Sequence, residues 1–426
     1  MTSPSTPLQG LLGPELVAPF APGPSLSDLP ATIGSLLGVD GPWRGDPLAL
    51  PGLADRYDRV VLLLVDGLGY AKLEGLAGDD RGLGELVTRH AAHLGPEGWL
   101  GRPLTTVAPS TTTVATTVLA GNGAAPAELG ILGYTQLLPA LGLVANMLFW
   151  RPAWSDHGSG DLEAWGFAPE TALLTPTIHQ VLSAAGVSSR TLQPATIASS
   201  PLSRLQNAGA EVDGYVGWVD MLTRLAAHLE ESVGTRGYTF AYLPDVDTLM
   251  HRDGPATPTF LPLLEALVGG LTRTLAGLSA RARRRTLLLI TADHGHHLVP
   301  PAEALFVDEL PWLSDRLAWR AAGEPRHVFL YARRGGRDAL LDEARARLGG
   351  RFTVLAGEAA VAAGLYGDPT RLHPEATARV GDVVLLARGG AALWGSRAER
   401  LPLGMHGSLT RDEMLVPLLA LDLEAP

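Results

Sequence analysis

The chain has 426 residues, of which 46% are hydrophobic, so it can fold as one large α/β domain or as two or three smaller ones. Its 33 basic and 44 acidic residues leave a formal net charge of −11, which argues against a general nucleic-acid binder, so no duplex partner is expected. It contains no cysteine, which excludes disulfides, thiolate zinc sites and a cysteine nucleophile. Any metal must therefore be held by His, Asp and Glu.

The first forty or so residues are rich in Pro, Gly, Ser and Leu. We expect residues 1–40 to form an N-terminal extension on the surface of a main domain over residues 41–426. The N-terminus lacks a basic region followed by an apolar one, and no apolar run approaches ~20 residues. We therefore expect a cytoplasmic protein with no membrane partner.

Three short apolar runs along the chain are each followed by an acidic residue. They are "VVLLLVDGLGY" from residue 60, "YTFAYLPDVD" over 238–247 and "RTLLLITADHGHH" over 285–297. Helical stretches such as "TPTIHQVLSAAG" separate them, which is typical of a mainly parallel sheet covered on both faces. Functional groups in such sheets gather beyond the carboxyl ends of the strands, so Asp66, Asp247 and Asp293 are expected there.

The segment "PLTTVAPSTTTVATTVLAG" from residue 103 combines seven threonines and a serine with a helix-like pattern. With Ser110 as N-cap and Gly121 just past the last turn, the residues predict a helix from about Thr111 to Ala120. Thr111 to Thr113 would then lie where free backbone N–H groups and the helix dipole favour an anion. Taken alone, this segment favours a simpler interpretation, in which the threonines cap and pack a buried helix.

Candidate metal ligands follow two of the apolar runs and recur near the C-terminus. In "DTLMH", Asp247 and His251 are one helical turn apart, so both can face one ion. Asp293 and His294 stand side by side in "TADHGHH", and His406 lies between glycines in "GMHG". Together with Asp66 and a hydroxyl at a helix N-terminus, these residues could hold two divalent cations and supply a nucleophile. Two such cations can bind a phosphoryl group between them.

Several nearby residues are given lesser roles. His296 and His297 are expected to be exposed or to hydrogen-bond the ligands rather than to bind a metal. The aromatic residues Phe149, Trp150 and Trp154 could line a pocket for a leaving group, although ordinary core packing explains them equally well. After residue 300 the pattern is less regular, and residues of about 300–400 are expected to form an elaboration or small lobe of the main domain.

Six motifs, taken in their order along the chain, resemble those of the alkaline phosphatase superfamily and, within it, of the nucleotide pyrophosphatase/phosphodiesterase branch. They are "LLLVDGLGY", "PSTTTVATTVLAG", "LGILGY", "YLPDVDTLMHRDGP", "TADHG" and "GMHG". The resemblance runs from about residue 58 to the C-terminus. It implies an alkaline-phosphatase-like three-layer α/β sandwich, with a central mainly parallel sheet flanked by helices and a small inserted lobe. It also implies two zinc sites, whose ligands are Asp247, His251 and His406 in one and Asp66, Asp293, His294 and the nucleophile oxygen in the other.

The resemblance also selects a nucleophile. In family members this residue lies ten positions before the glycine that ends the helix, and counting back from Gly121 gives Thr111, which is therefore the expected catalytic residue and metal ligand. Thr112 is the alternative, or a substrate contact, because a one-residue shift of the helix cap would move the role to it. Relatives carry an Asn after the next motif, where this chain has Tyr134; a phenol can also donate to a phosphate oxygen.

The function implied is a two-metal phosphoric-ester hydrolase, a phosphodiesterase or nucleotide pyrophosphatase acting on a small phosphate ester or nucleotide through a phosphothreonine intermediate. Mixed imidazole and carboxylate ligands favour zinc, and manganese is also compatible. A phosphomonoesterase on the same scaffold is the closer alternative, and a catalytically silent metal-binding protein the more distant one. The sulfatase branch is disfavoured, because "APSTT" lacks its C/S-x-P-x-R motif. The sequence predicts no oligomeric state.

Overall fold

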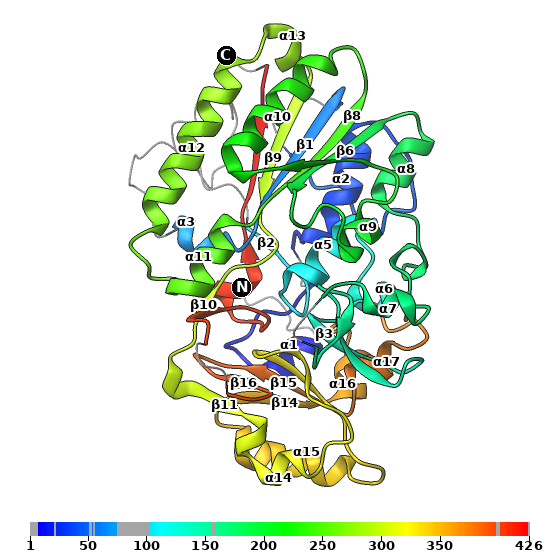
Figure 1. The fold of residues 1–426 in the computed structure, drawn as a ribbon, viewed down its shortest axis with the longest axis vertical. Coiled ribbons are helices and arrows are strands. Elements are labelled where there is room, and N and C mark those ends of the chain that lie inside the picture. Colours follow the sequence, from blue (N-terminus) through cyan, green and yellow to red (C-terminus); the bar gives the residue numbers. More distant parts are fainter. Residues whose placement is uncertain are drawn as a thin grey trace.

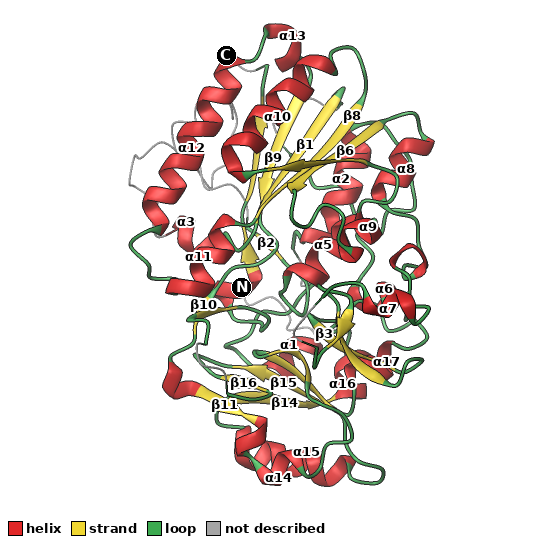
Figure 2. Cartoon of the chain, in the orientation of Figure 1, coloured by secondary structure: helices red, strands yellow, loops and turns green. Residues whose placement is uncertain are grey.

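The computed structural model describes residues 7–20, 23–50, 53, 56–74, 103–155, 158–397 and 401–424. Its centre is a six-stranded sheet of order β19-β9-β1-β8-β6-β7, in which all neighbours are parallel except β19, which is antiparallel to β9 (Figure 2). The strands are β1 (Arg59–Val65), β6 (Ser188–Pro194), β7 (Glu211–Tyr215), β8 (Gly237–Leu243), β9 (Thr286–Thr291) and β19 (Leu418–Asp422). This confirms the predicted mainly parallel sheet.

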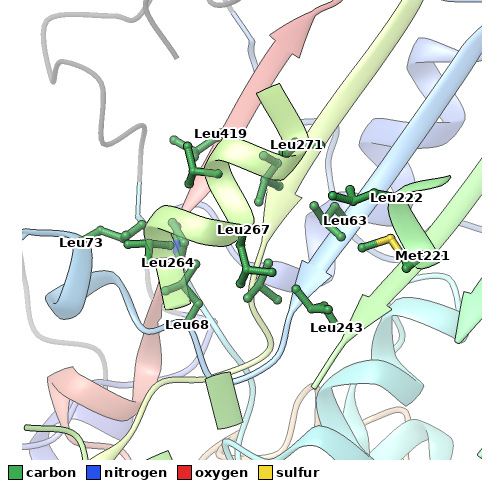
Figure 3. Close-up of a pocket in the computed structure, with 14 residues that line it drawn as sticks. Leu63, Leu68, Leu73, Met221, Leu222, Leu243, Leu264, Leu267, Leu271 and Leu419 are labelled. Carbon is green, nitrogen blue, oxygen red and sulfur yellow. The ribbon is translucent and has the colours of Figure 1, made fainter. Parts of the chain in front are cut away.

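Helices cover both faces of this sheet, as its continuous apolar strands require. Every residue of β1 is buried. On one face lie α10 (Gly217–Glu231) and α12 (Phe260–Gly277), which with β1, β8, β9 and β19 enclose a small apolar cavity of about 50 Å³ (Figure 3). On the other lie α2 (Leu29–Leu36), α5 (Thr112–Ala120), α8 (Ile178–Ala184) and α9 (Pro201–Gln206) (Figure 1). The three layers form the main hydrophobic core.

A second, antiparallel sheet lies below the first (Figure 1), with the order β14-β15-β13-β12-β3-β4-β5. Its strands are β3 (Thr135–Leu138), β4 (Leu143–Asn146), β5 (Arg151–Pro152), β12 (Ala322–Glu324), β13 (His327–Leu330), β14 (Phe352–Ala356) and β15 (Val383–Ala387). It is accompanied by α14 (Pro311–Ser314), α15 (Arg337–Leu348), α16 (Gly357–Ala362) and α17 (Ala376–Val380). The lobe expected over about 300–400 therefore shares its sheet with residues 135–152, which the sequence did not indicate.

The N-terminal segment is more deeply buried than expected. Besides α1 (Pro7–Leu12), it forms α2, whose Leu29 and Ile33 are fully buried in the main core. A segment with such contacts does not simply lie over the surface. The boundary at residue 40 stays a prediction.

Short strands and helices complete the fold around the carboxyl ends of the main sheet. Two antiparallel pairs join distant parts of the chain there, β2 (Leu104–Thr105) with β18 (Leu415–Val416), and β10 (His297–Leu298) with β17 (Gly404–Met405). A parallel pair, β11 (Ala304–Phe306) with β16 (Ala392–Trp394), lies in the lower half. The remaining helices are α3 (Tyr70–Glu74), α6 (Pro126–Leu129), α7 (Asp161–Ala164), α11 (Asp245–Asp253), α13 (Ala280–Arg283) and α18 (Arg411–Met414).

Candidate active site

Three carboxylates meet where three neighbouring strands of the main sheet end. Asp66 directly follows β1, Asp293 lies two residues after β9, and Asp247 lies in the first turn of α11, which follows β8. Because β9, β1 and β8 are adjacent and parallel, their carboxyl ends open onto the same edge of the sheet. Asp66 and Asp293 are almost completely buried. The structure thus brings together the three acidic residues that the sequence singled out.

The first cluster consists of Asp66, Asp293 and His294, whose donor atoms lie within 4.8 Å of one another. Nε2 of His294 is 3.4 Å from Oδ1 of Asp66 and 3.6 Å from Oδ2 of Asp293. Oδ1 of Asp293 accepts the backbone N–H groups of Gly67 (3.1 Å) and His294 (3.0 Å). Its Oδ2 is buried without a hydrogen-bond partner, which leaves a bare carboxylate oxygen facing the cluster.

The second cluster consists of Asp247, His251, His296 and His406, whose donor atoms also lie within 4.8 Å of one another. Oδ1 of Asp247 is 3.2 Å from Nε2 of His251, 3.0 Å from Nε2 of His296 and 3.8 Å from Nε2 of His406. His251 follows Asp247 by one turn of α11, as expected. His296 was expected to stay outside the ligand set, but the structure places it in this cluster. Nδ1 of its neighbour His297 lies 3.3 Å from Oδ2 of Asp412 instead.

All four histidines of the two clusters are oriented in the same way, with Nδ1 on a main-chain carbonyl. The contacts are His251 to Gly404 (2.7 Å), His406 to Ser110 (3.0 Å), His294 to Gly295 (3.2 Å) and His296 to Gly67 (3.3 Å). Because a carbonyl oxygen only accepts, each Nδ1 must carry a proton, and Nε2 is the ring nitrogen that faces the carboxylates. This orientation is typical of metal-binding histidines.

The electrostatics of the clusters reflect the crowding of acidic groups in a buried space. Burial raises the pKa of Asp66 well above its ordinary value, and the carboxylates of Asp293 and Asp247 add to this effect. Tyr242, from β8, donates its hydroxyl to Asp66. Such a group of carboxylates and lone pairs suits divalent cations.

The hydroxyl at the first cluster is that of Thr112. Its Oγ1 lies 3.1 Å from Nε2 of His294 and 3.3 and 3.4 Å from the two oxygens of Asp66. Helix α5 begins at Thr112, with Thr111 as the N-cap, and the Thr111 hydroxyl hydrogen-bonds the carboxyl of Glu324. The position expected for Thr111 is therefore occupied by Thr112, the alternative that a one-residue shift of the cap allowed.

The reason for the shift is a long-range contact of Ser110, which was expected to be the cap. Its hydroxyl donates to the carbonyl of Ser408 (2.6 Å) and accepts the N–H of Gly407 (3.1 Å). The Ser110 N–H donates to the carbonyl of Gly407 (3.2 Å), and its own carbonyl receives Nδ1–H of His406. Ser110 therefore fixes the loop that carries His406, and its hydroxyl bonds residues 407 and 408 instead of the start of the helix.

A cavity of about 740 Å³ opens in front of both clusters. Its lining includes Asp66, Thr111, Thr112, Tyr134, Tyr242, Asp247, His251, Arg320, Glu324, Trp394 and His406. Burial raises the pKa of Tyr134, so its phenol stays protonated and can donate a hydrogen bond. The expected substrate contacts, Tyr134 and Thr112, thus both face this cavity.

Glu324 is a cavity residue that the sequence did not indicate. Burial raises its pKa to about 7, although hydrogen bonds from the Thr111 hydroxyl and the Tyr134 N–H act in the opposite direction. The aromatic residues 149, 150 and 154 are not in the described lining of the cavity. Trp150 is buried against Phe167, with ring centroids 4.9 Å apart, as core packing predicts.

A fully buried ion pair supports the loops that carry the ligands. Nε and Nη2 of Arg326 donate to the two carboxylate oxygens of Glu413 at 2.7 and 2.9 Å, and both side chains are 0% exposed. The same carboxylate accepts the Ser408 N–H (3.0 Å) and the Thr410 hydroxyl (2.5 Å), and the Glu413 carbonyl accepts the Gly295 N–H (2.9 Å). Glu413 therefore connects the turn after His294, through its carbonyl, to the loop after His406, through its paired carboxylate.

The family model described as "Type I phosphodiesterase / nucleotide pyrophosphatase" matches residues 60–409, which is more than half of the chain. The chain belongs to this family, a branch of the alkaline phosphatase superfamily, and the resemblance seen in its motifs is confirmed. Its members hydrolyse phosphoric esters. No curated protein sequence matches the chain.

Solved structures with the same fold include two mammalian proteins and one bacterial protein. Human ectonucleotide pyrophosphatase/phosphodiesterase 5 matches 85% of this chain and 87% of its own (TM-score 0.62, 18% identity). An inactive variant of the murine protein, with one threonine replaced by alanine and AMP bound, matches 84% and 87% (TM-score 0.59, 17% identity). Phosphonoacetate hydrolase from Sinorhizobium meliloti 1021, bound to phosphonoformate, matches 84% and 89% (TM-score 0.58, 20% identity). At these identities the likeness establishes the fold alone.

Among the described residues, none of the helices has the length and apolar character needed to cross a membrane.

Proposed function

We propose that the chain is a two-metal hydrolase that cleaves phosphoric diesters or nucleotide pyrophosphates, with Thr112 as its nucleophile. The observation that carries this proposal is the position of Thr112 Oγ1, 3.1 Å from His294 and 3.3 Å from Asp66 at the N-terminus of α5. A hydroxyl held there is within reach of both a cation bound by these residues and a substrate in the cavity. Membership of the family supports the reaction class.

The residues of the two clusters fit divalent cations. Asp247 Oδ1, Asp293 Oδ2 and His296 Nε2 are buried without hydrogen-bond partners, and bare buried acceptors are costly unless a cation satisfies them. Asp66, Asp293 and His294 would hold one ion, and Asp247, His251 and His406 the other. Imidazole with carboxylate favours zinc, and manganese is compatible. When bound, the pair supplies positive charge that lowers the pKa of an alcohol and stabilises phosphoryl oxygens.

The side chains around the clusters have defined parts in the reaction. Thr112 Oγ1 attacks phosphorus, the bond from phosphorus to the leaving oxygen breaks, and the phosphoryl group is carried by the threonine. Water then attacks the same phosphorus and releases Thr112. The nearest acceptor for the hydroxyl proton is the carboxylate of Asp66, since Nε2 of His294 would bind the ion. The free N–H groups at the start of α5 favour the anion that forms there.

The cavity is compatible with a small phosphate ester or a nucleotide. Its 740 Å³ falls within the range of sites for ligands of that size. Tyr134 can donate to a phosphoryl oxygen, and Arg320 adds a positive charge on the cavity wall. One related structure contains AMP and another contains phosphonoformate, so both proteins bind phosphorus oxyanions. The murine relative is inactive when one threonine is replaced by alanine.

The test compares Thr112→Ala with Thr111→Ala, using bis-p-nitrophenyl phosphate as the diester and p-nitrophenyl phosphate as the monoester, with metal content measured on each sample. Thr112→Ala should lower diester turnover by roughly three orders of magnitude or more, because it removes the phosphoryl acceptor. Thr112→Ser should keep part of the activity. Thr111→Ala is the matched control, since it removes a neighbouring hydroxyl that contacts Glu324 instead of the cluster.

Each outcome separates the alternatives. Mass spectrometry after acid quench should locate the added phosphoryl group on the peptide containing "PSTTTVATT". Turnover of the monoester well above that of the diester would make the chain a phosphomonoesterase. Metal binding without turnover of either substrate would favour the catalytically silent alternative. Loss of activity in Thr111→Ala together with normal activity in Thr112→Ala would refute the assignment of the nucleophile.

A further inference from the structure

We propose that His296 is a fourth protein ligand of the second metal site, so that the ion beside Asp247 is held by one carboxylate and three imidazoles. This deepens the proposed function, since it rests on metal binding at the two clusters. The motifs that the chain shares with its family account for Asp247, His251 and His406, whereas His296 was expected to lie outside the ligand set. The site therefore differs from that expectation by one imidazole.

The hydrogen bonding of His296 determines which nitrogen faces the cluster. Its Nδ1 lies 3.3 Å from the carbonyl oxygen of Gly67, which can only accept, so Nδ1 carries the proton. Nε2, the other ring nitrogen, therefore faces the cluster and lies 3.0 Å from Oδ1 of Asp247. Both atoms are buried and neither has a hydrogen-bond partner. A cation shared by these two atoms would satisfy both.

The backbone leaves room for the imidazole at one specific position. Gly67 has φ +73°, and a Cβ built on it would lie 2.5 Å from Cε1 and 3.0 Å from Nδ1 of His296. The glycine at the end of β1 thus allows the ring to approach Asp247, whose Cα would also be 3.0 Å from such a Cβ. The same glycine supplies the carbonyl that orients the ring.

His296 reaches the cluster from the protein interior. His251 and His406 line the cavity, but His296 does not, and only 1% of its side chain is exposed. It can therefore add a donor without narrowing the space available to a substrate. Its ring contacts those of the two other histidines, with centroids 5.1 Å from His251 and 5.4 Å from His406, so all three imidazoles surround one point.

The fourth ligand makes the two sites chemically unequal. Zinc in proteins is usually four-coordinate and can become five-coordinate in a transition state, whereas catalytic sites with three protein ligands keep a position open throughout. Asp247 with three imidazoles supplies all four donors. The first cluster supplies Asp66, Asp293 and His294, and its remaining position is next to Thr112. We therefore expect the ion beside Asp247 to be retained more tightly than the ion beside Thr112.

The first measurement is made on the unaltered protein. Apo protein labelled with ¹⁵N-histidine is titrated with zinc, and the side-chain nitrogen signals are followed by NMR. Four Nε2 signals should shift on metal binding, those of His251, His294, His296 and His406, and the His296 signal should shift in the same step as those of His251 and His406. Three shifting signals at full zinc loading, with that of His296 unmoved, would overturn the proposal while leaving the proposed function intact.

The second measurement is zinc affinity by competition with a chromogenic chelator. The unaltered protein should release zinc in two steps, and His296→Gln should weaken the tighter step by at least about 100-fold, beyond the 10–100-fold typical of residues that only orient ligands. Gly67→Ala should weaken the same step, because it displaces the ring without removing it. His297→Gln is the control and should leave both steps unchanged.

The outcomes distinguish this proposal from the one on which it rests. An unchanged tighter step in His296→Gln, with the weaker step also unchanged, refutes the fourth ligand. Binding of no zinc by the unaltered protein refutes the proposed two-metal function as well. If His296→Gln does not fold, the NMR titration of the unaltered protein still decides the question.

Discussion

Replacement of Glu413 by glutamine tests how the active-site loops are held together. Burial acts to raise the pKa of Glu413, but the adjacent Arg326 guanidinium outweighs it and holds this pKa below its ordinary value of 4.5. The carboxylate is therefore charged at pH 7 and pairs with a buried cation. In Glu413→Gln the guanidinium remains buried, one of its two carboxylate contacts is replaced by an N–H group, and its charge has no counter-ion.

The structure sets the size of the effect. A hydrogen bond to a charged group contributes about 1.5 to 3 kcal/mol, and one such bond is lost. The uncompensated buried charge adds a further penalty, which agrees with the roughly 3 to 5 kcal/mol measured when one partner of a buried pair is removed. Arg326 keeps its contacts with the carbonyls of Gly389 (2.9 Å) and Ala391 (2.7 Å), which limits the loss. Since proteins are typically stable by about 5 to 15 kcal/mol, the expected loss is a large fraction of the total.

The assay is urea unfolding of the metal-free protein at pH 7, followed by circular dichroism. Glu309→Gln is the matched control, because Glu309 makes the same two-pronged contact with Arg397 at 2.7 and 2.9 Å, but on the surface. Its unfolding midpoint should be close to that of the unaltered protein. Arg326→Met with Glu413→Gln should lose less stability than the sum of the two single changes, since the unpaired charge is gone.

Two results would refute this reasoning. One is a midpoint for Glu413→Gln that equals that of Glu309→Gln, which would show that the buried charge has found solvent or another partner. The other is exact additivity in the double variant, which would show that the two side chains stabilise the fold independently. In either case the ion pair would not be what holds Glu413 in place between the turn after His294 and the loop after His406.

Three further outcomes are expected. Burial lowers the pKa of His179 to about 3 from its ordinary value of 6.5. The neutral buried ring therefore contributes its full stability above pH 6.5, and this contribution is lost as the pH falls from 6.5 toward 3. Between pH 7 and pH 5 the unaltered protein should lose about 2 kcal/mol through this residue, and His179→Gln, unfolded at the same two pH values, should not. An unchanged pH dependence would contradict the burial of the ring. In urea unfolding, Gly407→Ala should lower the stability more than Gly166→Ala. Both glycines have a positive φ, but only at Gly407 would a Cβ meet another side chain, at 2.6 Å from Cβ of Glu324. Equal losses of stability would argue against that contact. Chelation should lower the thermal midpoint and added zinc should restore it, as for any ion that binds only the folded state, and a midpoint insensitive to zinc would count against both metal sites.

Local sequence patterns predicted the part of the site that depends on local structure. Asp66 and Asp293 could be placed because an apolar strand that ends in an acidic residue has a known position in a parallel sheet. Asp247 and His251 could be paired because four residues make one helical turn, and α11 provides that turn. The mainly parallel sheet followed from the same strands. These inferences need only the periodicity of each element and the rule that parallel strands end together.

The sequence could not reveal features that depend on distant contacts. The cap of α5 moved by one residue because Ser110 bonds Gly407 and Ser408, about 300 positions later in the chain. His296 required knowledge that Gly67 leaves space for a ring. The three histidines of "TADHGHH" gave a signal, but nothing local distinguished the second from the third. Strands β3 to β5 joined the later strands of the lower sheet through a pairing of Gly323 with Thr135, which no local pattern indicates.

The bridge between Ser110 and Gly407 has a consequence for how the protein matures. Ser110, two residues before Thr112, and the loop of His406 position each other, and β18 pairs with β2. Because the second cluster includes His406, a growing polypeptide on the ribosome lacks part of this cluster until the C-terminal residues have emerged. Contacts of such large sequence separation also form slowly. The proposed metal binding would therefore be a late event of biogenesis, after the C-terminal strands have joined the sheet.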